Sequence, residues 1–101
     1  MQAGRELDVK VAEALGWGVE EMEGNGYTVP DFSTTWEGMG VLVEEAKKQG
    51  IAFRVETRFI DGSFFDYQCL ASNGQTFGMA TSGTAPYAAC LALLKVKGVA
   101  V

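Results

Sequence analysis

The chain has 101 residues, a length that suits one small domain with a modest core. Its formal charge is −5, which argues against direct binding of nucleic acid, because phosphates attract a basic surface. The composition, 48% hydrophobic and 21% charged, is ordinary for a globular protein and excludes wholesale disorder. We therefore expect a single domain over residues 1–101.

Neither end nor interior of the sequence predicts a membrane protein. The longest apolar run, residues 88–94, is too short to span a bilayer, and the start of the chain lacks the pattern of a signal peptide. Cys69 and Cys90, without a secretion signal, predict buried free thiols in a reducing compartment. The expected location is the cytoplasm.

The first predicted element is a helix over residues 5–15, where apolar residues recur at helical spacing and Gly16 supplies a stop. Trp17 follows directly and has two interpretations. It either folds back under the helix as a core anchor, which we favour, or stands exposed as a stacking platform.

Residues 18–33 show no period, and we expect an acidic loop there. A structureless stretch of this length is often functional or mobile. The alternative, which we favour, is a solvated connector that Tyr27 and Val29 attach to the body. The candidate binding residues of this loop are Glu20, Glu21, Glu23 and Tyr27.

A second helix is predicted over residues 35–49. Thr34 and Glu37 have the spacing of a capping box, and Gly50 supplies the stop. The expected core stripe consists of Trp36, Met39, Gly40, Val43 and Ala46.

Three strands are predicted over residues 52–60, 64–71 and 75–81. Alternation of apolar and polar residues indicates strands, and Asp61-Gly62 and Asn73-Gly74 are strong hairpin signals, so we expect an antiparallel meander.

The hydrophobic pattern also predicts the register of the meander. A three-residue first loop, with Gly62 in a bulge, sets Phe59 opposite Phe65 and Arg58 opposite Asp66. A two-residue second loop sets Cys69 opposite Gly78. One sheet face is then strongly apolar and the other half apolar. The half-apolar face needs a cover or is a contact surface, with candidate binding residues Leu70, Phe77 and Met79.

The last predicted helix covers residues 85–97, with Thr84 as cap and Pro86 in its first turn. It is apolar on most sides and should pack across the sheet. The fold class is therefore α+β: a three-stranded antiparallel β-meander with helices packed on it, in the order α-α-β-β-β-α.

The sequence offers little chemistry. It has no histidine, its cysteines lack metal-ligand spacing, and no glycine pattern suits a phosphate loop. Asp66 has a structural partner in Arg58, and Asp61 is a turn residue. We expect no enzyme, no metal and no cofactor.

Three segments carry a family resemblance: LDVKVAEALGW at 7–17, PDFSTTWEGMGVLVEEAKKQG at 30–50 and TAPYAACLALLKV at 84–96. They resemble the phage ABA sandwich domain family, small uncharacterised proteins of phages and prophages. The chain departs from that family's pattern in the acidic insert around residues 24–26. The resemblance implies a phage-type origin, a bacterial host cell, and an α/β/α sandwich with helices on both faces of the sheet. It implies no catalytic residues.

Three functional hypotheses stay open. The first is a non-enzymatic binding protein that contacts a host protein with a basic surface; a concrete version is an inhibitor of a bacterial defence system, such as an anti-CRISPR. The second is a homo-oligomeric sponge for a small nucleotide, which would need Arg5, Arg54 and Arg58 to cluster. The third is an accessory or structural phage protein that self-associates through the half-apolar face.

Overall fold

The computed structural model describes residues 1–100 and shows an α+β fold with one three-stranded sheet. The α+β class and the antiparallel meander are confirmed. The elements are α1 (Arg5–Ala14), α2 (Val19–Gly24), α3 (Trp36–Lys48), β1 (Ala52–Ile60), β2 (Ser63–Ser72), β3 (Phe77–Ser82) and α4 (Ala85–Val96). The three long helices match their expected positions, and α2 is an addition to the expected order.

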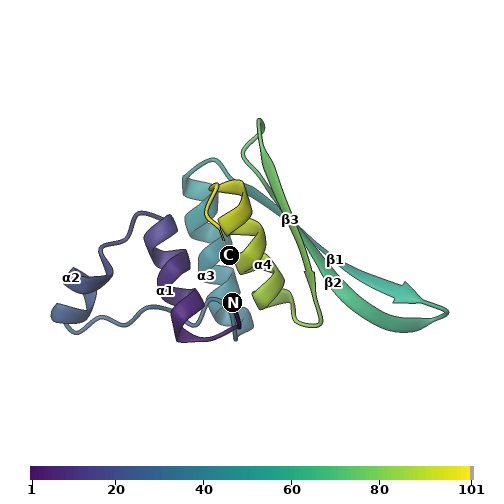
Figure 1. The fold of residues 1–101 in the computed structure, drawn as a ribbon, viewed down its shortest axis with the longest axis horizontal. Helices are drawn as coiled ribbons and strands as arrows, with labels where there is room; N and C mark the ends of the chain where they lie inside the picture. Colours follow the sequence, from purple (N-terminus) through teal and green to yellow (C-terminus); the bar gives the residue numbers. More distant parts are fainter. Residues whose placement is uncertain (101) are drawn as a thin grey trace.

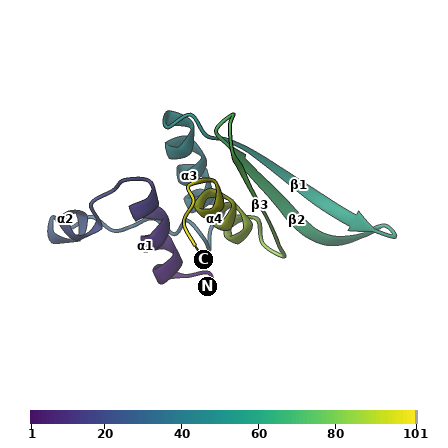
Figure 2. The same cartoon turned by 45° about the horizontal axis from the view of Figure 1, so that its top comes forward.

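The helices form layers on one side of the sheet (Figure 1). Helix α4 lies against β3 and β2, α3 packs beside α4, α1 packs on α4, and α2 contacts only α1. A second view shows the same arrangement (Figure 2). We call the face under α4 the inner face and the opposite one the outer face.

This layering differs from the sandwich that the family resemblance implied, since no described helix covers the outer face. Helix α1 buries Leu7 and Val11 against the other helices instead. The molecule is elongated as a result, with extents of 50 × 28 × 22 Å.

Small residues let α4 approach the sheet closely. The inner face presents Cys69, Ala71 and Ala80, all buried, and a Cβ on Gly78 would lie 2.4 Å from the carbonyl oxygen of Ala92. The strand and helix backbones therefore meet at Gly78, where no larger residue fits.

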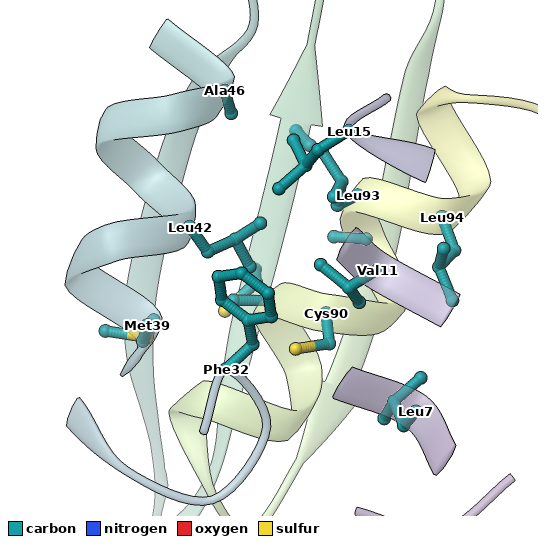
Figure 3. Packing of buried hydrophobic residues seen from close by; sticks show 14 of the residues in the cluster. Leu7, Val11, Leu15, Phe32, Met39, Leu42, Ala46, Cys90, Leu93 and Leu94 are labelled. Carbon is teal, nitrogen blue, oxygen red and sulfur yellow. The ribbon is translucent and has the colours of Figure 1, made fainter. Parts of the chain in front are cut away.

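The hydrophobic core lies between the helices and is centred on Phe32, Leu42 and Leu93, all fully buried (Figure 3). Trp17 is half-buried against this core, with its ring centroid 5.6 Å from that of Phe32. The interpretation of Trp17 as a core anchor is confirmed, because its ring packs against the buried cluster.

Buried polar contacts fasten the 28–34 segment to α1. The backbone N–H of Ser33 donates to Asp8 Oδ1 at 2.8 Å, and the N–H of Gly4 donates to Ser33 Oγ at 2.8 Å. Asp8 and Ser33 are the buried polar side chains of the described chain, and both are satisfied. These hydrogen bonds take the place of the hydrogen bonds to water that the buried groups have lost.

The expectation of a structureless loop over residues 18–33 is wrong at its start, where α2 forms. Six residues are too few for a hydrophobic period to show in the sequence. Gly18 is the N-cap of α2, and Val19 is its buried residue.

The expected three-residue first turn is also wrong. Asp61 and Gly62 form a two-residue turn with φ of 52° and 79°, so Ile60 pairs with Ser63 and Phe59 with Phe64. A bulge follows, which skips Phe65. Beyond it the expected pairs return, with Arg58 opposite Asp66. The bulge absorbs the extra residue that we had assigned to the turn.

The second turn is longer than expected, so the expected pairing of Cys69 with Gly78 is wrong by two residues. Cys69 lies opposite Ala80, and Leu70 lies opposite Met79. The cause is Asn73, whose Oδ1 accepts hydrogen bonds from the N–H groups of Gln75 and Thr76 at 2.9 and 2.8 Å. A register shift of two residues keeps every side chain of β3 on the same face of the sheet. Leu70, Phe77 and Met79 therefore lie on the outer face as expected.

Helix α3 starts one residue later than the capping-box pattern indicated. Thr35 is the cap, and its Oγ1 accepts from the N–H of Gly38 at 2.9 Å. Trp36 is 55% exposed, so its expected place in the core stripe is wrong. Leu42 is a buried core residue of α3 instead.

No helix among residues 1–100 has the length and apolar character needed to cross a bilayer.

Candidate functional site

The β1–β2 hairpin projects beyond the helices as an arm, which we define as residues 55–67 (Figure 1). The projection has a simple geometric cause. Helix α4 has 12 residues and spans about 18 Å at 1.5 Å per residue, whereas the nine-residue β1 spans about 30 Å at 3.3 Å per residue. The helix layer therefore ends before the hairpin does.

Large apolar side chains cover this arm. Phe59 is 61% exposed and Phe65 is 55% exposed, in a chain whose other phenylalanines include the fully buried Phe32. Because apolar side chains of this size rarely gather in water without a partner, the cluster is a candidate interaction surface. We call it the arm patch, and it consists of Trp36, Val55, Phe59, Ile60, Phe64 and Phe65.

Aromatic contacts through Tyr67 join three residues of the patch, Phe59, Phe64 and Trp36. Ring centroids lie 6.1 Å apart for Phe59 and Phe64, 5.1 Å for Phe64 and Tyr67, and 5.9 Å for Tyr67 and Trp36. This row runs from the hairpin tip to the start of α3. Rings held by one another lose little conformational entropy on binding, which favours their use as anchors.

Arg58 and Asp66 stiffen the other side of the arm. The guanidinium donates two hydrogen bonds of 2.6 Å to the carboxylate and lies 5.4 Å from the ring centroid of Phe65. The hydrogen bonds from Arg58 hold the pKa of Asp66 below its usual range. The pair is therefore ionised at neutral pH and fixes Phe65 beside it.

The outer face carries a second, smaller apolar area. The structure brings Leu70 and Met79 directly opposite each other, and Phe77 follows two residues from Met79 on the same face. Phe77 is 68% exposed, and the amide of Gln68 lies over the sulfur of Met79 at 3.2 Å. These three predicted residues do form one area.

The predicted acidic residues lie at the other end of the molecule, on α2 (Figure 2). Glu23 forms an ion pair with Arg5, whereas Glu20 and Glu21 have no ion pair among the described residues. Tyr27 is exposed just beyond the helix. The structure thus separates the predicted binding residues into two distant groups.

Sequence reasoning missed the arm patch, although one signal was present. Phe59-Ile60 and Phe64-Phe65 flank the Asp61-Gly62 turn, and a tight turn lies at the end of a sheet, where helices rarely reach. Consecutive apolar residues on both sides of a turn therefore indicate exposure on both faces.

The candidate nucleotide-binding arginines do not gather. Arg5 lies on α1, which makes no contact with β1, and it pairs with Glu23. Arg58 pairs with Asp66, and Arg54 lies 3.7 Å from Glu56. Each cation already faces a carboxylate, so the described chain presents no basic cluster for a phosphate.

The remaining chemistry is sparse within residues 1–100. No group of three or more His, Cys, Asp or Glu side chains could hold a metal ion there. A polar hollow of about 350 Å³ lies between the start of α1 and the 28–34 segment and includes Arg5 and Asp8.

Burial raises the pKa of the Cys69 thiol to about 11. Burial also raises the pKa of the Cys90 thiol, as does nearby Asp8.

The fold and these surfaces define a small α+β protein whose sheet is covered on one face and extended by an exposed aromatic arm. A solved structure described as a phage protein from Bacillus cereus ATCC 14579 is similar, with a TM-score of 0.72 over 100% of this chain and 96% of that one. The sequences are 17% identical, so the likeness shows the fold.

The sequence comparisons add no relatives. No family model matches the chain, and the search of curated proteins finds no match. The resemblance to the phage ABA sandwich domain family is therefore not confirmed by a family model.

Proposed function

We propose that this protein is a phage-type, non-enzymatic binding protein that acts through protein–protein contact made by its arm. The observation that carries the proposal is the arm patch, a row of exposed aromatic side chains held rigid by mutual contacts. Rigid aromatic side chains are the residues that most often dominate binding energy at protein interfaces. The fold shared with a phage protein supports the phage-type origin, and a bacterial host cytoplasm is the setting we propose.

A finer version of this proposal is an inhibitor of a bacterial defence system, comparable in effect to an anti-CRISPR. Its specific support is the acidic end of the molecule, where Glu20 and Glu21 are exposed, together with the charge of −5. Such a surface would attract a host protein with a basic surface. This version uses α2 for long-range attraction and the arm for contact.

The test compares three forms of the protein as bait in host-cell extract. The arm variant carries Phe59→Ser and Phe65→Ser, and the α2 variant carries Glu20→Lys and Glu21→Lys. All four positions are exposed, so both variants should keep the wild-type circular dichroism spectrum. We expect the arm variant to lose the bound protein and the α2 variant to bind it more slowly, with a weaker dependence on salt.

Two outcomes would contradict the proposal. If the arm variant retains every partner of the wild type, the arm patch is not the contact surface. If partner binding fails only in the α2 variant, the acidic end carries the function alone. A small-molecule sponge would instead show binding of a nucleotide by calorimetry without any protein partner.

A further inference from the structure

Strand β1 leaves one edge of the sheet open. The strand order is β1-β2-β3, so β1 pairs with β2 on one side and with no described strand on the other. Seven of its nine residues are exposed, and no turn or loop of residues 1–100 bonds to its backbone. A long open edge presents a row of unpaired N–H and C=O groups to any second strand.

We propose that the occupant of this edge is a second copy of the chain, which pairs its own β1 antiparallel to the first about a two-fold axis at Thr57. The inference goes beyond the proposed function, because it adds a second copy of the chain to the proteins that the arm contacts. The product is a continuous six-stranded sheet in which both copies keep their helices on the same side.

Symmetry and charge select the register. Two-fold pairing sets residues at equal distances from the axis opposite each other, on one face of the sheet. An axis at Glu56 would place Arg54 of one copy opposite Arg58 of the other, and the two copies of Glu56 opposite each other. Like charges directly opposite each other are destabilising. An axis at Thr57 instead places Glu56 opposite Arg58 of the partner subunit, and symmetry repeats this favourable pair on the other side of the axis.

Arg58 can make this second contact without giving up its first. Its bonds to Asp66 use Nε and Nη2, and a guanidinium carries five N–H donors in all. Nη1 is therefore left to donate to Glu56 of the partner subunit. Each interstrand pair would gain Glu56 of the partner subunit, so two symmetric three-residue networks would cross the interface.

The apolar residues favour the same axis. An axis at Val55 also sets Arg54 opposite Glu56, but it places Phe59 opposite Ile51, which is already buried. The axis at Thr57 sets Phe59 opposite Val55 of the partner subunit, and both are exposed. The part of β1 that belongs to each arm then lies beside the same part of the partner's β1.

The apolar side chains and the charge of the arm suit a dimer. Three of its exposed apolar side chains, Val55, Phe59 and Ile60, lie on β1 itself beside the open edge, and pairing would bury part of each. Over β1 and the arm together, Arg54 and Arg58 nearly balance Glu56, Asp61 and Asp66, so two copies can meet there without the repulsion that a charge of −5 suggests.

The first test is the mass of the full-length protein in solution. Light scattering after size exclusion should give a dimer for the wild type and for Phe77→Ser on the outer face. Glu56→Lys replaces both favourable pairs with Arg58 of the partner subunit by repulsive ones. It should therefore raise the dimer dissociation constant about tenfold. A monomeric wild type overturns the inference, and a dimer that only Phe77→Ser disrupts places the interface on the outer face and overturns it too.

Cysteine cross-linking tests the register separately. Directly opposite residues have Cα atoms about 4.5–5.5 Å apart, which suits a disulfide. Thr57→Cys should give a disulfide-linked dimer under mild oxidation, while Glu56→Cys should give several-fold less. The buried native cysteines do not compete. Cross-linking through residue 56 in preference to residue 57 overturns the register.

These results remain separable from the proposed function. A monomeric wild type whose arm variant still loses a host protein refutes self-association and leaves the proposed function standing. A dimer that binds no host protein in any form supports self-association and refutes the contact with a host.

Discussion

Arg58 and Asp66 join the two strands of the arm through two hydrogen bonds of 2.6 Å, at the first regular pair after the bulge. Two parallel bonds fix orientation as well as distance. The pair therefore keeps the hairpin in register where no helix supports it.

The first prediction concerns pH. The pKa of Asp66 is lowered in the folded chain by the hydrogen bonds from Arg58, so its contribution to stability is full above the ordinary carboxyl pKa. The contribution is lost as pH falls through the lowered value. Urea unfolding at about pH 7 and about pH 3 should show a larger loss in the wild type than in Asp66→Asn. Equal losses would show that the pair does not stabilise the fold.

The second prediction compares two glycines of α3. A Cβ on Gly38 would lie 2.0 Å from the carbonyl oxygen of Asp31, whereas one on Gly40 meets nothing within 4 Å. Gly38→Ala should lower the free energy of unfolding by about 1–3 kcal/mol or more. Gly40→Ala should raise it by roughly 0.5–1 kcal/mol, because alanine favours the helix. Urea titration of both variants measures the difference, and similar values would contradict the close contact at Gly38.

The third prediction concerns the buried contact between Asp8 and Ser33. Asp8→Ala removes the acceptor of the Ser33 N–H and should cost about 1–3 kcal/mol in the free energy of unfolding. Asp8→Asn keeps an acceptor oxygen at the same place and should cost less. Thermal unfolding of the two variants gives the comparison, and an alanine variant as stable as the asparagine variant would argue against it.

The fourth prediction concerns the thiols. Both cysteines are fully buried, and burial raises the pKa of Cys69 to about 11. At about pH 8 the native protein should react with a disulfide reagent such as DTNB only as fast as it unfolds. In denaturant both thiols should react at once. Rapid reaction of the native protein would mean that β2 or α4 opens locally.

Most of the fold could be predicted because most elements are longer than one hydrophobic period. The alternation of β1 and the apolar character of α4 predict their positions to within a residue at most ends. The two errors of register arise from contacts that a pattern does not encode. One is a bulge at Phe65, and the other is a turn held by the side chain of Asn73.

The candidate site was harder to predict than the fold. An apolar stripe predicts which side of an element is buried, but it does not predict where a covering helix ends. Phe59 therefore resembles a buried residue of the strongly apolar face, and its exposure depends on the relative lengths of α4 and β1. Leu70, Phe77 and Met79 could be placed because strand alternation alone assigns a face.

The position of α4 also has a consequence for synthesis. Among the described elements α4 makes the main contacts with the sheet, yet it follows all three strands in the chain. On the ribosome the strands are therefore translated before the helix that buries their inner face. Until α4 is released, Cys69, Ala71 and Ala80 have no cover, so the nascent meander exposes an apolar face that favours aggregation.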